Sequence, residues 1–95
     1  MPKGYVILTE AIKDSEGMKA YGQAAGAAMG GATILAVDTT PEPLEGTWHG
    51  DQTVVLEFES VDAARAWYES EAYQKAAKLR RAAADCNAVI ISGFG

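Results

Sequence analysis

The chain has 95 residues, the size of one small domain, and its thirteen acidic and eight basic side chains give a net charge of −5. This acidic balance argues against a nucleic-acid partner, because phosphate backbones attract basic surfaces. The single Cys86 excludes an internal disulfide, and no apolar run approaches the roughly 20 residues of a membrane helix, so we expect a soluble, cytoplasmic protein without a membrane partner.

The first half of the chain is expected to form a strand, a helix and a second strand. Residues 4–11 are short in extent and rich in β-branched and aromatic side chains, which favours a strand. Apolar residues recur at helical spacing over residues 15–29, which predicts an Ala-rich helix. Residues 32–38 are again typical of a strand.

The second half is expected to add a long connection, a third strand, a helix and a last strand. The connection, 39–52, contains two prolines that keep it out of a central sheet position. The third strand, 53–59, alternates between two faces. Ser60 caps a helix over residues 60–84 that kinks at Ser70, and residues 88–92 form the last strand.

The order β-α-β-β-α-β predicts one α+β domain over residues 1–95, with the ferredoxin-like fold. Right-handed connections place two helices on one face of a four-stranded antiparallel sheet. The other face is left bare, yet the first strand is apolar on both sides, with Tyr5 and Ile7 opposite Val6 and Leu8. Because a second apolar face is rarely left exposed, we expect a homodimer whose two sheets face each other as a dimeric α/β barrel.

Several motifs in the chain resemble the DUF1330 family, for which no function is established. They are Glu45-Gly46-Thr47-Trp48, Val54-Val55-Leu56-Glu57-Phe58, Ala63-Ala64, Trp67-Tyr68-x-Ser70-x-x-Tyr73-Gln74 and Leu79-Arg80. The resemblance covers nearly the whole chain and implies membership of the dimeric α/β-barrel superfamily. Two positions depart from the family pattern: Gln52 stands where members often carry Arg, and Glu59 where they carry Pro. The first departure removes a positive charge near the long connection, which weakens the case for an anion site there.

Glu57 and Arg80 are the candidate catalytic residues. A carboxylate on a central strand is costly to bury unless it is paired. Glu57 is therefore either a general base held against a ligand, or a group that forms an ion pair or meets water and the partner subunit. Arg80 falls at helical spacing from Tyr73, so its guanidinium could point under the helix and clamp a carboxylate. The alternative is that Arg80 belongs to an exposed basic face at the helix end.

Trp48, His49 and Tyr68 are the candidate ligand-binding residues. The two aromatic side chains could wall a pocket, although aromatics also serve as core or interface anchors. His49 is the only histidine, and it could act as an acid, a base or a haem ligand, or could simply be exposed. One histidine, one cysteine and scattered carboxylates show no metal-ligand spacing, so we expect no metal and no cofactor.

Two functions are compatible with these residues. The first is a cofactor-independent enzyme of isomerase or monooxygenase type, acting on a small organic acid or aromatic compound, as the resemblance to the superfamily implies. Glu57 would then move a proton and Arg80 would hold an anionic group. The alternative is a non-catalytic dimeric module that binds a small ligand or is structural, since no motif with independent catalytic force occurs.

Overall fold

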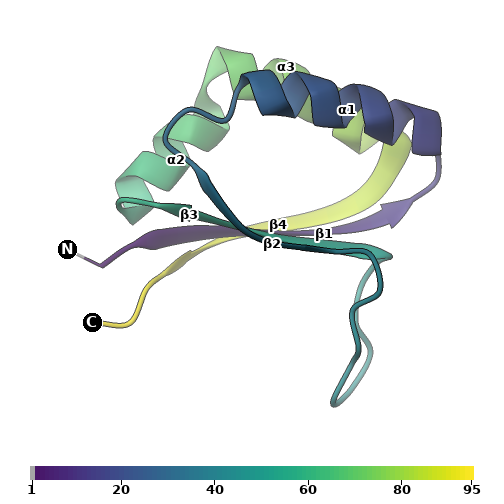
Figure 1. The fold of residues 1–95 in the computed structure, drawn as a ribbon, viewed down its shortest axis with the longest axis horizontal. Helices are drawn as coiled ribbons and strands as arrows, with labels where there is room; N and C mark the ends of the chain where they lie inside the picture. Colours follow the sequence, from purple (N-terminus) through teal and green to yellow (C-terminus); the bar gives the residue numbers. More distant parts are fainter. Residues whose placement is uncertain (1) are drawn as a thin grey trace.

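The computed structural model describes residues 2–95, in which three helices cover one face of a four-stranded antiparallel sheet (Figure 1). Met1, with which the expected domain begins, lies outside the described residues. The elements are β1 (Gly4–Ile12), α1 (Ser15–Ala27), β2 (Thr33–Asp38), β3 (Gln52–Phe58), α2 (Val61–Glu69), α3 (Glu71–Ala83) and β4 (Ala84–Ser92). The strand order is β2-β3-β1-β4. The expected α+β, ferredoxin-like fold is thereby confirmed.

Side-chain oxygens define where the helices begin. The Asp14 carboxylate accepts from the Gly17 amide at 3.2 Å, and the Ser60 hydroxyl accepts from the Ala63 amide at 3.0 Å. Ser70 serves two helices, because its hydroxyl donates to the Trp67 carbonyl at 2.7 Å and accepts from the Tyr73 amide at 3.2 Å. The expected kink at Ser70 is thus a full break between α2 and α3.

The last strand is longer than its sequence pattern predicts. The sequence pattern predicts it over residues 88–92, whereas β4 begins at Ala84, directly after α3. Its first residues pair with the end of β1, from Ile12 with Ala84 to Thr9 with Asn87. Asp85, Cys86 and Asn87 lack an apolar alternation and join the sheet through the backbone ladder, whereas the side chain of Ala84 is buried.

The two faces of the sheet differ in what covers them. Val6, Leu8, Leu56 and Phe58 point toward the helices and are buried in the core. There the rings of Trp67 and Tyr73 pack with centroids 3.9 Å apart, and Trp67 also contacts Phe58 at 5.1 Å. The alternate residues of β1, β3 and β4 point to the opposite side, which we call the open face: Tyr5, Ile7, Thr9, Thr53, Val55, Glu57, Asn87, Val89 and Ile91.

The long connection between β2 and β3 hangs from the side of the sheet opposite the helices (Figure 1). Its end is fastened to β1, because the Asp51 amide donates to the Glu10 carbonyl and the Ile12 amide donates to the Asp51 carboxylate, both at 2.8 Å. Within residues 2–95, no helix is both long and apolar enough to cross a lipid bilayer.

Candidate functional site

Five polar side chains lie between the sheet and the helices, and we call them the buried polar cluster. They are Glu10 on β1, Gln52 on β3, Tyr21 on α1, and Tyr73 and Arg80 on α3. Glu10 is 0% exposed and Arg80 is 2% exposed. The Gln52 amide donates to Glu10 Oε1 at 2.7 Å, the two tyrosine hydroxyls lie 2.9 Å apart, and the Arg80 guanidinium carbon lies 5.9 Å from the centre of the Tyr21 ring.

Two atoms of this cluster lack a hydrogen-bond partner among residues 2–95. They are Glu10 Oε2 and Arg80 Nε. An unsatisfied buried polar atom costs on the order of 1–3 kcal/mol, and more when the group is charged, so such atoms are uncommon in folded proteins. The two unpartnered atoms set this cluster apart from the rest of the core among residues 2–95.

The environment of the cluster shifts its protonation equilibria. Burial raises the pKa of Glu10 above its ordinary value of 4.5, while the hydrogen bond from Gln52 and the positive charge of Arg80 oppose that change. Burial also raises the pKa of Tyr21, and the neighbouring Tyr73 adds to this effect. Glu10 therefore holds its proton more tightly than an exposed carboxyl, which suits a group that exchanges protons with a substrate.

A cleft of about 190 Å³, which we call the α1 cleft, opens between α1 and the β2–β3 half of the sheet. Its walls are largely apolar, formed by Ala25, Met29, Ile34, Val37, Val54 and Trp67. Tyr21 and Gln52 line it as well, so the cleft borders two members of the buried polar cluster, and Gln52 links it to Glu10 through a hydrogen bond. On α1, a Cβ added at Gly22 or Gly26 would meet nothing within 4 Å, which shows how open this side of the cleft is.

The two residues expected to be catalytic lie on opposite faces of the sheet. Glu57 points to the open face, where Tyr5 donates to its carboxylate at 3.1 Å. This hydrogen bond, followed by burial and the charge of Glu57, raises the pKa of Tyr5. Arg80 lies between the layers, beneath α3, and not on an exposed basic face at the helix end. The structure therefore groups Arg80 with Glu10 and leaves Glu57 apart.

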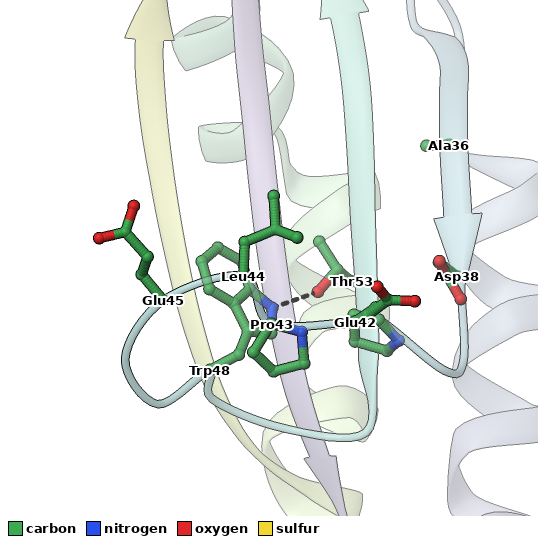
Figure 2. Close-up of a pocket in the computed structure, with 9 residues that line it drawn as sticks. Ala36, Asp38, Glu42, Pro43, Leu44, Glu45, Trp48 and Thr53 are labelled. Carbon is green, nitrogen blue, oxygen red and sulfur yellow. Dashed lines mark hydrogen bonds between the residues drawn. The ribbon is translucent and has the colours of Figure 1, made fainter.

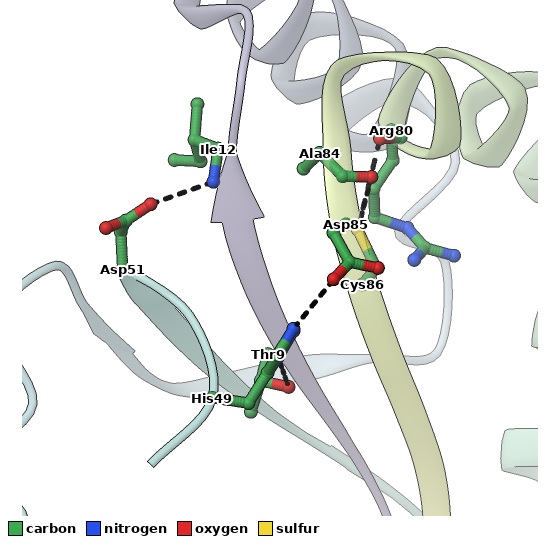
Figure 3. Close-up of polar contacts among 8 residues, drawn as sticks. All are labelled: Thr9, Ile12, His49, Asp51, Arg80, Ala84, Asp85 and Cys86. Atoms are coloured by element: carbon green, nitrogen blue, oxygen red, sulfur yellow. Dashed lines mark hydrogen bonds and ion pairs between the residues drawn. The ribbon is translucent and has the colours of Figure 1, made fainter. Parts of the chain in front are cut away.

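Trp48 and His49 lie together on the open side of the sheet. Trp48 donates to the Thr53 hydroxyl at 2.8 Å and lines a cavity of about 490 Å³ between the long connection and β2–β3 (Figure 2). His49 is held over the sheet by Thr9, with Nδ1 2.7 Å from the hydroxyl, and Nε2 lies 3.5 Å from the Asp85 carboxylate (Figure 3). Both residues also line a second hollow of about 370 Å³.

Tyr68, the remaining expected ligand-binding residue, shares a pocket with Arg80. This cavity, which we call the β4 pocket, has a volume of about 400 Å³ and lies along β4 and the end of α3. Its lining residues are Tyr68, Arg80, Arg81, Ala84, Asp85, Cys86 and Ala88. The structure thus brings together Trp48 with His49, and Tyr68 with Arg80, at two separate places.

Sequence reasoning missed Glu10 and Gln52. A signal for both exists in the alternation of the strands. Glu10 has the same parity as Val6 and Leu8 in β1, and therefore faces the helices. Gln52 pairs directly with Glu10 across the ladder and has the parity of the core-facing residues of β3. Two polar residues opposite each other on a buried face mark a place that packing alone does not explain.

Solved structures with the same fold come from several bacteria. RPA0582, a protein of unknown function from Rhodopseudomonas palustris, matches with a TM-score of 0.79 at 19% identity, over 99% of this chain and 84% of that one. A dimeric ferredoxin-like protein of unknown function from Thermobifida fusca matches with a TM-score of 0.66 at 15% identity, over 96% and 91%. SnoaB, a cofactor-independent oxygenase from Streptomyces nogalater, matches with a TM-score of 0.67 at 13% identity, over 100% and 96%. No curated protein matches the chain.

At such identities, these structures show the ferredoxin-like fold and nothing more specific. The sequence itself is more informative, because residues 3–94 match the family described as "Domain of unknown function (DUF1330)". This match spans all seven helices and strands and includes every motif on which the resemblance rested. The chain therefore belongs to the DUF1330 family.

Proposed function

We propose that this protein is a cofactor-independent enzyme that acts on a small organic acid or aromatic compound bound in the α1 cleft. The observation that carries the proposal is an apolar cleft bordered by Gln52, which hydrogen-bonds the buried Glu10 carboxyl and leaves Oε2 without a partner among residues 2–95. Small-molecule sites are typically apolar cavities with a few converging polar groups and a perturbed pKa. SnoaB, which has the same fold, is described as a cofactor-independent oxygenase.

In this proposal Glu10 takes the proton-transfer role that the sequence suggested for Glu57. Gln52 orients the Glu10 carboxyl through its hydrogen bond and leaves Oε2 for the substrate. Removal of a proton from a carbon acid by Glu10, and its return to a different carbon, is an isomerisation that needs no redox partner. In the oxygenase variant, dioxygen is the co-substrate and the deprotonated substrate supplies the electrons: a CH2 carbon becomes a carbonyl with one oxygen atom, and the other oxygen atom leaves as water with the two protons.

The test begins with a thermal-shift screen of small phenols and aromatic and aliphatic acids. For a compound that binds, we expect a C–H proton of the compound to exchange with deuterated solvent in a Glu10-dependent manner. NMR measures the rate of this exchange. Glu10→Gln should retain binding and lose exchange by at least about a hundred-fold, as is typical of a general base. Exchange at the wild-type rate in Glu10→Gln would overturn the role of this residue.

A matched pair of α1 variants tests the location. Gly26→Leu places a large side chain at the cleft, whereas Gln23→Leu adds the same side chain at an exposed position of the same helix. We expect Gly26→Leu alone to abolish ligand binding. Equal binding by both variants would show that the ligand lies elsewhere.

We further propose that the chain forms a homodimer through its open face. Val89 and Ile91 are 49% and 43% exposed on that face, beside the half-buried Ile7 and Val55. The protein from Thermobifida fusca is described as dimeric. Trp48 is 49% exposed and belongs to the connection that hangs from this side of the sheet, so in the proposed dimer it would contact the partner subunit. Glu57 would then lie in the interface, held by Tyr5.

Sedimentation velocity of two charge variants tests the dimer. Val89→Glu places a carboxylate on the open face and should give a monomer at micromolar concentration, because burying an unpaired charge is costly. Leu79→Glu, at a site 40% exposed on α3, is the control and should remain dimeric. A wild-type protein that sediments as a stable monomer would contradict the proposal.

The alternative, a non-catalytic dimeric binding module, is favoured by the Tyr5–Glu57 hydrogen bond, which satisfies Glu57 from within the protein. It predicts ligand binding in the α1 cleft with no proton exchange, in wild type and Glu10→Gln alike. The deuterium experiment therefore separates the two functions.

A further inference from the structure

We propose that the β4 pocket is a second binding site, specific for a small carboxylate that pairs with the guanidinium of Arg80. This pocket and the α1 cleft have no lining residue in common. The proposal does not depend on the reaction assigned to the cleft.

Arg80 carries a buried positive charge that the protein neutralises incompletely. Its side chain is 2% exposed, and no carboxylate of residues 2–95 forms an ion pair with it within 4.0 Å. The positive charge of Arg80 acts on the pKa of the Glu10 carboxyl, which already accepts a hydrogen bond from the Gln52 amide. Burial alone would lower the pKa of Arg80, but Tyr73, Cys86 and Tyr21 more than offset this and raise it, so the guanidinium stays charged. These neighbours are not carboxylates, so a bound carboxylate would add the ion pair that the described residues do not form.

The surroundings of Arg80 in the β4 pocket favour negative charge. Arg81 lines the same pocket and adds a second cation, whose guanidinium makes one long contact of 3.5 Å to Gln74. Asp85 is the acidic residue of the lining, but its carboxylate points toward His49, 3.5 Å away, whereas the Arg80 guanidinium points away from both (Figure 3). The Cys86 thiol is directed at the backbone carbonyl of Ala84, at 3.5 Å.

The geometry of a guanidinium selects the class of anion. Its donors lie in one plane and match the two oxygens of a carboxylate, with two parallel hydrogen bonds. Arg80 Nε is buried and has no partner among residues 2–95, so it is the donor of this guanidinium that the protein leaves unsatisfied. A cavity of about 400 Å³ holds a small carboxylate and its organic substituent, and Tyr68 and Ala88 supply surface for that substituent.

The test uses sodium acetate and sodium benzoate as probes, with inorganic phosphate as the competing oxyanion. Each is titrated into nitrogen-15-labelled protein at constant ionic strength, and the Arg80 Nε–H resonance is followed together with the melting temperature. We expect a saturable shift of that resonance with the carboxylates, accompanied by stabilisation. No saturable shift with either carboxylate, or saturation with phosphate only, would overturn the proposal.

Three variants locate the binding. Arg80→Lys keeps the charge but loses the planar fork, and should weaken carboxylate affinity at least about ten-fold. Ala88→Leu fills the pocket and should weaken it similarly while leaving Arg80 in place. Lys78→Met removes an exposed charge of the same helix outside the pocket, and should bind as wild type does. Wild-type affinity in both Arg80→Lys and Ala88→Leu would show that the carboxylate binds elsewhere.

Discussion

The buried carboxyl of Glu10 is hydrogen-bonded by an uncharged side chain and not by a cation. Its partner across the ladder is an amide, Gln52, at the position where the family pattern often has Arg. An arginine there would place a positive charge against the Glu10 carboxylate and favour its ionised form. With glutamine, burial dominates and the pKa of Glu10 is raised. In the proposed function, the departure at residue 52 would therefore affect proton transfer by Glu10 rather than an anion site beside the long connection.

The raised pKa of Glu10 makes a prediction about stability and pH. The folded state holds this proton more tightly than the unfolded chain, so the stabilising contribution is full below the ordinary pKa of 4.5 and is lost as the pH rises through the higher folded value. Glu10→Gln cannot ionise and escapes this loss. Its free energy of unfolding, relative to wild type, should therefore rise from acid to neutral pH in urea denaturation experiments.

The control for this measurement is Glu69→Gln, which removes an exposed carboxylate of α2. If the free energy of unfolding relative to wild type rises with pH in Glu10→Gln and not in Glu69→Gln, the raised pKa of Glu10 is supported. Curves for Glu10→Gln and wild type that stay parallel across the pH range would show that burial does not perturb this carboxyl.

Gly50 is a second residue on which the site depends, because it lets the long connection pass against β1. Its φ is +87°, and the Cβ of an alanine there would lie 2.7 Å from the carbonyl carbon and oxygen of Glu10. Gly46 has a similar φ of +71° but nothing within 4 Å. Gly46→Ala should cost roughly 1–2 kcal/mol from backbone strain alone. Gly50→Ala should cost at least about 2 kcal/mol more, because the strand must also move.

Urea denaturation of both variants, with the slope held constant, measures this difference. His49 should also lose its contact with Thr9 in Gly50→Ala, which a changed imidazole NMR signal would report. Equal losses of stability in the two alanine variants would mean that β1 absorbs the extra carbon without strain.

Helix α1 is rich in alanine, which is a good helix former, but it also contains glycines whose surroundings differ from one another. At Gly22 an added Cβ meets nothing within 4 Å, whereas at Gly17 it would lie 2.8 Å from the Cβ of Ala83 and 2.9 Å from the Asp14 carboxylate. Gly22→Ala should therefore stabilise the protein by roughly 0.5–1 kcal/mol through helix propensity. Gly17→Ala should destabilise it, because α1 must move away from the end of α3.

Thermal and urea unfolding of these two alanine variants check the signs. Both variants replace a glycine of α1 by alanine, so the gain in helix propensity is the same. The difference in stability between them therefore measures the close contact of residue 17 with Ala83 and Asp14. A stabilising Gly17→Ala would show that α1 and α3 are less closely packed than the structure has them.

The elements also show how far sequence patterns reach. The two faces of β1 and β3 could be predicted because side chains alternate with a period of two, which is a local property. The start of β4 could not, because Asp85, Cys86 and Asn87 carry no apolar pattern and join the ladder through backbone pairing with β1. Glu57 stands out in the sequence because its neighbours are apolar, whereas Glu10 lies near the end of a strand, where polar residues are common. The approach of Arg80 to Glu10 depends on how α3 crosses the sheet, which no local pattern encodes.

The whole molecule is thin, with Cα extents of 37 × 35 × 16 Å. The helices cover only one face of the sheet, so the core is small and the open face remains exposed. Self-association through that face should therefore add substantially to stability. For the proposed homodimer, the melting temperature should rise with protein concentration, because unfolding releases two chains. Calorimetry over a hundred-fold range of concentration measures this, and Val89→Glu should show no such dependence. A constant melting temperature for the wild type would contradict a folding-coupled dimer.

The pairing of β1 with β4 sets a limit on when this domain can finish folding during its synthesis. β1 lies between β3 and β4, and its ladder with β4 runs from Gly4–Ser92 to Ile12–Ala84. A ribosome adds roughly 5–20 residues per second from the N-terminal end. The nascent chain can pair β1 with β3 early, but the other side of β1 keeps free amides and carbonyls until residue 92 has left the ribosome. During that interval the central strand is an exposed edge, which is the form most open to chaperones and to pairing with other nascent chains.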